Sequence, residues 1–134
     1  MKKLLFFLLI GSALFMASSC TKQYNEIVPN KTFISDPISS SSWTTNDGGK
    51  NYQVDIDMSG QLGNGGTTYN GVLVYLTFDN GQSYEALPEV YNNVSFTYTY
   101  SAGVITLYAQ SSDGTQVITP PQAFKAKIVL VASN

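Results

Sequence analysis

The chain has 134 residues, with seven Lys, no Arg, nine Asp and Glu, no His and one Cys. A net charge of −2 offers no basic surface to a nucleic acid, and the lack of His removes the commonest general base and zinc ligand. A single Cys excludes an intrachain disulfide, whereas a hydrophobic content of 43% is too high for a disordered chain and indicates one globular domain.

The N-terminus has the layout of a secretory signal. Met1-Lys2-Lys3 is cationic, and Leu4 to Ala17 carries no charge. This stretch is shorter than the roughly 20 apolar residues of a membrane-spanning helix. Ala17-Ser18-Ser19-Cys20 follows and resembles the lipobox of bacterial lipoproteins, in which the Cys is acylated and becomes the first mature residue. We therefore predict a signal peptide over residues 1–19 and a lipid anchor at Cys20. The alternative is ordinary signal cleavage that leaves a free thiol.

Residues 20–42 separate the predicted anchor from the rest of the chain. This stretch has few apolar residues, two Pro and a run of four Ser, which is typical of a linker. We predict a flexible tether over 20–42 and a folded domain over 43–134. In the alternative, Thr32-Phe33-Ile34 is already a first strand and the tether ends near Asn30. Acyl chains on Cys20 would fix the protein to a membrane without spanning it.

Beyond residue 42, apolar residues recur with a period of two, which predicts β-strands. Apolar and polar residues alternate from Tyr52 to Ser59, which predicts a half-buried strand with one face exposed to solvent. Val72 to Phe78 is apolar on both faces and predicts a central strand covered on both sides, or one facing a second sheet and a loop. Asp79-Asn80-Gly81 predicts a hairpin turn after it. Four later segments are also predicted strands: Gln82–Leu87, Val94–Ser101, Val104–Ala109 and Ala123–Ala132.

No segment predicts a helix, and Gly60 to Gly66 is expected to be a flexible loop. Thr119-Pro120-Pro121 blocks a sheet ladder, so Gln116 to Ile118 is expected to form only a short edge strand. Seven or eight strands at spacings of about 10 residues predict an all-β fold, an antiparallel two-sheet β-sandwich. A small barrel is the alternative.

A resemblance to a known family rests on strand and turn motifs within residues 43–131. The family consists of small uncharacterised lipoproteins of Bacteroidetes-type bacteria, with no assigned activity. The resemblance therefore implies a β fold and the cell envelope, and it implies no function. We expect a lipid-anchored protein of the outer membrane, with a periplasmic or surface-exposed face. The motifs are Tyr52–Met58, Asn70–Leu76, Tyr84–Pro88, Ser95–Tyr98, Gly103–Tyr108, Ser112–Gly114 and Phe124–Val129.

Acidic residues are the first candidates for a functional site. Asp55 and Asp57 lie two apart on one predicted strand face, as cation ligands can. The Asp-x-Asp-x-Asp-Gly loop is absent, however, so a solvated face that discourages edge pairing is the preferred interpretation. Carboxylate pairs for glycoside hydrolysis can be drawn with Asp79, Glu85 or Glu89, but nine acids on a small surface always yield pairs. No catalytic residue, metal or cofactor is predicted.

Aromatic residues are the second candidates. A flat aromatic surface on a sandwich is suited to stacking sugar rings, and Tyr and Trp are enriched in binding surfaces. We select Trp43 together with Tyr69, Tyr84 and Tyr91, which lie in or near predicted loops. For Trp43, packing in the core is the alternative and is preferred.

Three functions compete on these observations. The first is a non-catalytic interaction or accessory module of the cell envelope that binds another envelope protein. The second is a carbohydrate-binding module at the cell surface that binds a glycan. The third is a hydrolase that uses acids, which the lack of His and Arg disfavours. The charge balance excludes nucleic acid as a partner, and the predicted anchor makes the membrane itself a partner through Cys20.

Overall fold

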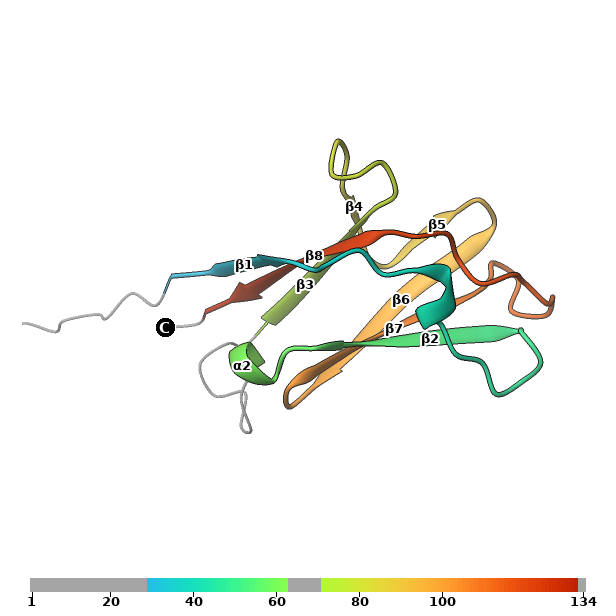
Figure 1. Ribbon diagram of the computed structural model, residues 1–134, viewed down its shortest axis with the longest axis horizontal. Coiled ribbons are helices and arrows are strands. Elements are labelled where there is room, and N and C mark those ends of the chain that lie inside the picture. The colour runs from blue at the N-terminus through green and yellow to red at the C-terminus, as the bar shows by residue number, and fades with distance from the viewer. Residues whose placement is uncertain (1–28, 63–70, 133–134) are drawn as a thin grey trace, which may run out of the picture.

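Turns built from Gly, Asn and Asp divide the chain into short strands, as the sequence predicts. A computed structural model describes residues 29–62 and 71–132 (Figure 1). The predicted signal peptide, Cys20 and Tyr69 lie outside the described residues. Eight strands are present in the described part, with a one-turn 3-10 helix and a one-turn α-helix. They are β1 Lys31–Ile34, η1 Ser40–Ser42, β2 Asn51–Asp57, α2 Ser59–Leu62, β3 Gly71–Thr77, β4 Glu85–Ala86, β5 Glu89–Tyr91, β6 Val94–Ser101, β7 Val104–Ser111 and β8 Lys125–Val131.

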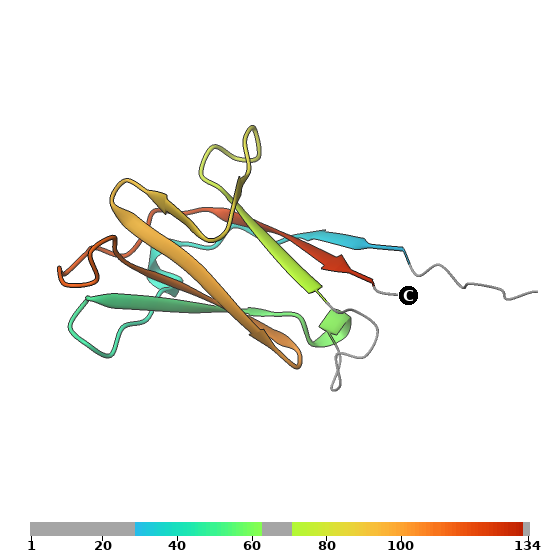
Figure 2. The same ribbon diagram turned by 180° about the vertical axis from the view of Figure 1, so that it is seen from behind.

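These strands form two antiparallel four-stranded sheets that face each other (Figures 1 and 2). The order is β1-β8-β3-β4 in the first sheet and β2-β7-β6-β5 in the second sheet. The predicted all-β two-sheet sandwich is confirmed, and the barrel alternative is wrong because the strands pair as two separate sheets. The chain passes directly from one sheet to the other between β4 and β5, through a cis Leu87–Pro88 bond.

The core lies between the sheets and follows the alternation in the sequence. Ile105, Leu107 and Ala109 of β7 are fully buried, as are the alternate residues Ala126, Ile128 and Leu130 of β8. Both strands lie inside their sheets, where a face buried against the opposite sheet fixes the register. Tyr98 of β6 reaches across and donates a hydrogen bond of 2.6 Å from its hydroxyl to the Val72 carbonyl of β3, which joins the two sheets.

Aromatic side chains fill one end of this core. Phe78 stacks on Tyr91 with ring centroids 4.8 Å apart and lies 5.7 Å from Phe96 and 6.1 Å from Phe124. Trp43 continues the series, 5.6 Å from Phe124. These tilted and stacked arrangements are the ones that aromatic pairs prefer. We call these five residues the aromatic cluster.

Four expectations from the sequence need correction. Residues 59–62 form a helical turn, α2, because Asp57 Oδ1 accepts the Ser59 N–H at 2.9 Å and so caps its start. Gln116 to Ile118 form no strand, although the Ile118 N–H bonds to the Gly49 carbonyl. The return strand predicted over 82–87 is limited to the two residues of β4. The face of β3 away from the core is not fully covered, since Leu73 is 45% exposed.

The start of the fold also differs from the preferred expectation. β1 lies within the stretch predicted to be a tether, and it pairs with β8 from Lys31 to Ile34. Ile38 then forms an isolated bridge with Phe124. This agrees with the alternative in which Thr32-Phe33-Ile34 is already a first strand.

Candidate functional site

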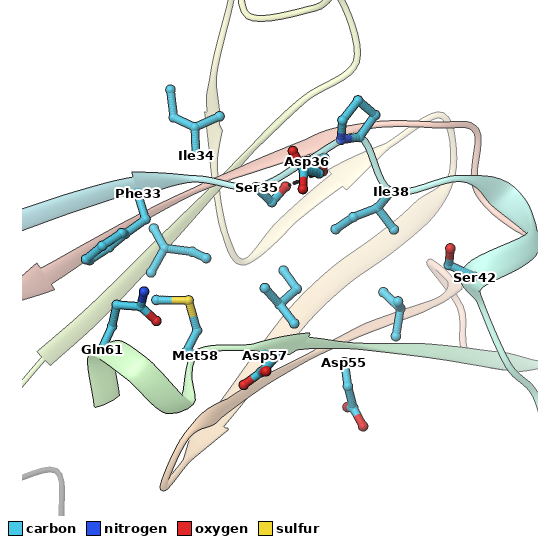
Figure 3. Close-up of a pocket in the computed structure, with 14 residues that line it drawn as sticks. Phe33, Ile34, Ser35, Asp36, Ile38, Ser42, Asp55, Asp57, Met58 and Gln61 are labelled. Carbon is cyan, nitrogen blue, oxygen red and sulfur yellow. Dashed lines mark hydrogen bonds between the residues drawn. The ribbon is translucent and has the colours of Figure 1, made fainter. Parts of the chain in front are cut away.

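A groove of about 450 Å³ lies between β1 and β2 (Figure 3). Such a volume falls within the range of ligand sites. We call it the β1–β2 groove. Its walls are one strand from each sheet, so it opens along one flank of the sandwich. It is lined by Phe33, Ile34, Ser35, Asp36, Pro37, Ile38, Ser42, Val54, Asp55, Ile56, Asp57, Met58, Gln61 and Ile128.

The groove exists because both of its walls are edge strands. Among the described residues, β1 pairs only with β8, and β2 pairs along its length only with β7. The one addition to β2 is an isolated bridge in which Thr44 and Gln53 exchange two backbone hydrogen bonds, of 2.9 and 2.8 Å. In an antiparallel ladder alternate residues point their N–H and C=O to the same side. Asp55 and Asp57 therefore direct their backbone groups toward the groove side of β2, as Gln53 does.

Each end of the groove is closed by a short helical turn. Ser42 of η1 stands at one end, and Met58 and Gln61, at and within α2, stand at the other (Figure 3). Phe33 extends into the groove from β1, and Gln61 extends into it from α2. The distance along β2 from Val54 to Met58 is about 14 Å, at about 3.4 Å per residue. A short extended chain of four or five residues matches that length.

The acidic residues of β2 do not face the groove with their side chains. Asp55 and Asp57 point away from it, onto the outer face of the second sheet (Figure 3). Asp55 Oδ1 accepts a hydrogen bond of 2.7 Å from Thr106 Oγ1 on β7. The Ser59 N–H, and then the Ser59 side chain, lower the pKa of Asp57. Within the described residues no group of three metal-ligating side chains includes this pair.

The opposite flank of the sandwich is built from β4 and β5, and it carries a second pair of acids. Burial, a hydrogen bond that the protonated Glu89 donates to Glu85, and the negative charge of Glu85 together raise the pKa of Glu89 to about 7, from an ordinary value of 4.5. The Glu89 Oε1 atom is buried and has no hydrogen-bond partner in the described structure. Asp79, Glu85 and Tyr91 line a smaller hollow of about 120 Å³ here. The hydrolase hypothesis named these acids, and the structure brings Glu85 and Glu89 together.

The candidate aromatic site is not assembled as one surface. Trp43 is only 6% exposed and belongs to the aromatic cluster, which agrees with the preferred core interpretation. The Tyr91 ring is stacked on Phe78. The ammonium group of Lys127 lies 4.0 Å from the Tyr84 ring centroid and 5.0 Å from that of Tyr75, and so covers part of both rings. Tyr69 lies outside the described residues.

Sequence reasoning also missed a repeated turn. In Thr45–Asn51 and Thr77–Ser83 the first Thr hydroxyl donates to an Asp two residues on, and accepts the N–H of a Gly four residues on. The Asp then accepts the next two N–H groups. The shared pattern Thr-x-Asp-x-Gly was visible in the sequence. Gly49 and Gly81 have φ of 91° and 95°, a conformation that favours Gly.

These turns hold their carboxylates ionised. Hydrogen bonds from the Asn51 backbone and side chain, with those from Thr45 and Lys50, lower the pKa of Asp47 to about 2. Bonds from the Ser83 side chain and backbone, and from Thr77, hold the pKa of Asp79 well below its usual range. Both residues thus have a structural role in the loops.

Comparison of the chain with family models, with curated proteins and with solved structures finds no match. The family resemblance seen in the strand motifs therefore stays a prediction. In the described residues no helix is long and apolar enough to cross a membrane.

Proposed function

We propose that this protein is a lipid-anchored interaction module of the cell envelope, which binds a partner and does not catalyse a reaction. The observation that carries the proposal is the β1–β2 groove. It combines a hollow of about 450 Å³ with two strand edges that have no strand neighbour among the described residues. Backbone edges of this kind recognise other chains by strand addition.

The anchor half of the proposal rests on the N-terminal sequence. The cationic start, the uncharged stretch and the single Cys agree with acylation of Cys20. β1 begins at Lys31, so about ten residues separate Cys20 from the sandwich. Such a linker spans at most about 35 Å when extended. The domain would then stand close to the membrane, where its partners are other envelope proteins.

A site-specific crosslinking experiment in cells tests the binding half. A photo-crosslinking amino acid at Gln61, which extends into the groove, is compared with the same group at Thr97. Thr97 is exposed on β6, a strand inside the second sheet, and serves as the matched control. We expect a discrete adduct with an envelope protein from position 61 and none from position 97. Equal adducts at both positions, or none at 61, would contradict the proposal.

Cys20→Ser tests the anchor half in the full chain. We expect the wild type to incorporate a labelled fatty acid and to sediment with membranes, and the variant to do neither. Labelling or membrane association that survives the substitution would show that the anchor lies elsewhere.

Trp43, the first aromatic candidate, gives the carbohydrate alternative no support. Trp43 has no ring face open to a sugar, because it packs against Phe124 inside the fold. A glycan screen with Trp43→Ala would therefore confuse loss of binding with loss of folding. Tyr84→Ala is the better control, since that ring lies outside the aromatic cluster and is paired with Lys127 at the surface.

A further inference from the structure

We propose that the β1–β2 groove binds an extended peptide segment in which basic and apolar residues alternate, and that the segment docks as an added strand on the free edge of β2. This inference rests on the proposed function and names the chemistry of the partner. It is carried by the direction of the β2 backbone groups, the inner wall of the groove and the charge on its rim.

The backbone groups at the outer edge of β2 are oriented to pair with an additional strand. Thr44 already bonds to Gln53 in both directions, so one residue of sheet has been added at this edge. Beyond it, Asp55 and Asp57 present backbone groups of the same orientation. An incoming strand would take the place next to Asp55 and Asp57, where the chain between Ile38 and Thr44 turns away through η1.

The two faces of the added strand would contact different kinds of side chain, carboxylates on the outer face and apolar side chains in the groove. Residues paired with Asp55 and Asp57 would lie beside these carboxylates on the outer face, because directly opposed residues share a face. Lys or Arg is favoured there. The residue paired with Ile56 would point into the groove, toward the partly buried Phe33 and Ile38. An apolar, β-branched side chain is favoured there.

The charge beside the β2 edge supports a basic segment. The charged residues that line the groove are Asp36, Asp55 and Asp57, and the Asp55 and Asp57 carboxylates lie on the outer face of the second sheet, beside the place of the added strand. Lys31 lies on β1 two residues before Phe33, and it is not a lining residue. A segment with acidic residues would therefore meet like charge along β2, whereas a basic one meets complementary charge.

The other edge of the second sheet is not equivalent. β5 has three residues and runs into Asn92 and Asn93, which both have positive φ. Short edge strands next to irregular turns are poor templates for an added strand. The added strand therefore pairs with β2, over a stretch of about five residues, the length between η1 and α2.

The test uses the full-length protein in a non-ionic detergent and synthetic hexapeptides with blocked ends. The first hexapeptide alternates Lys and Val, and the second alternates Glu and Val. Titration calorimetry should show binding of the Lys peptide and about tenfold weaker or no binding of the Glu peptide. Equal binding of the two peptides, or no binding of the Lys peptide, would overturn the inference.

Two methylated peptides distinguish strand addition from docking by side chains alone. In the proposed register the Lys amides face β2 and the Val amides face away. N-methylation of the Lys residues should abolish binding, and N-methylation of the Val residues should preserve it. Hydrogen exchange at the Asp55 and Asp57 amides should slow when the unmodified peptide binds. Equal effects of the two methylations, or unchanged exchange, would overturn the added strand.

A pair of protein variants tests the charge of the groove at one exposed position. Gln61→Lys should weaken binding of the Lys peptide by about threefold, whereas Gln61→Glu should not weaken it. If both variants bind alike, charge complementarity is wrong. If the protein alone forms dimers that the Lys peptide cannot dissociate, a second copy occupies the edge and the inference is wrong.

The two proposals can fail separately. If the crosslink from position 61 captures an envelope protein but the Lys peptide does not bind, the interaction module stands and the peptide chemistry is wrong. If neither is seen, the groove is not a binding site.

Discussion

The two flanks of this sandwich differ in how the chain joins the edge of one sheet to the edge of the other. Each flank is where an edge of one sheet meets an edge of the other (Figure 1). At the β4–β5 flank the edge strands have two and three residues, the chain crosses between sheets through Leu87–Pro88, and Phe78 stacks on Tyr91 beside the crossing. At the β1–β2 flank the edge strands have four and seven residues, and the chain takes sixteen residues, 35–50, to cross.

The difference shows how connection length decides where a sandwich opens. A short crossing holds two edges together and lets aromatic rings fill the space, whereas a long crossing through η1 lets the edges separate. The short crossing stabilises the β4–β5 flank. The long crossing leaves a groove at the β1–β2 flank and a strand edge without a strand neighbour among the described residues. We therefore expect the β4–β5 flank to be the stable side of the sandwich and the β1–β2 flank to be its binding side.

Truncating a Phe on each flank gives the largest contrast. Phe78→Ala removes a ring that contacts three members of the aromatic cluster, and we expect it to lower the free energy of unfolding by about 3 kcal/mol. Phe33→Ala removes a partly buried ring that borders the open groove, and we expect about 1–2 kcal/mol, because no closed cavity forms. Urea denaturation measures both. Equal losses would show that the two flanks contribute equally to stability.

Glu89 makes the stability of the β4–β5 flank depend on pH. Its pKa is about 7 in the folded protein and 4.5 ordinarily, so the folded state keeps a proton that the unfolded state has already released. The stabilisation is complete below pH 4.5 and is lost as the pH rises through 7. Glu89→Gln should therefore raise the Tm by several degrees at pH 8 and leave it nearly unchanged at pH 4. Asp36→Asn, on the β1–β2 flank, is the control. A rise in Tm that is the same at both pH values would contradict this account.

The repeated turns should behave alike although they lie on different flanks. Asp47 precedes β2 and Asp79 precedes β4, and each accepts hydrogen bonds from the same positions of its loop. Because the pKa of each Asp is lowered, the contribution of each carboxylate is complete above about pH 4 and decreases as the pH falls from 4 toward its lowered pKa. Asp47→Ala and Asp79→Ala should each lower the Tm by a few degrees at pH 7 and by less at pH 2. A loss at only one site would show that the flank, and not the turn, controls stability.

The strands were predictable where local pattern and tertiary environment agree. β6 and β7 alternate apolar and polar residues and meet at Ala102-Gly103, so both their period and their boundaries are local properties. β3 was misjudged on its outer face. Leu73 is partly exposed, and Tyr75 is covered by a single Lys127 side chain from the neighbouring β8. Which strand supplies that cover depends on pairing between residues 52 positions apart, which composition and period do not reveal.

The groove could not be predicted because it depends on which strands are edges. The sequence predicts that Asp55 and Asp57 lie on a solvent-exposed strand face, and in the structure both residues are exposed. That their backbone groups border a hollow follows only from the pairing of β2 with β7 and from the path of residues 35–50. The burial of Trp43 has a related reason, since Trp43 lies at the crossing between the sheets and packs against Phe124. The two Thr-x-Asp-x-Gly turns, by contrast, were readable signals.

The substitution with the smallest expected effect on stability is also expected to change the self-association of the protein. Asp55 places a negative charge on the free edge of β2, and inward or edge charges keep such edges from pairing with one another. Asp55→Val should change the free energy of unfolding by no more than about 0.5 kcal/mol and should make the protein self-associate with increasing concentration. Sedimentation velocity measures the association.

Ser95→Val is the matched control for that change. It adds a β-branched apolar side chain to the outer face of the same sheet, on β6, where Ser95 pairs with Val90 of β5 on one side and with Gln110 of β7 on the other. If both variants self-associate, outer-face hydrophobicity alone is responsible and the free edge has no special role. If only Asp55→Val associates, β2 is the open edge of the sandwich, and the negative charge that prevents self-pairing is the same charge that would select a basic strand as its partner.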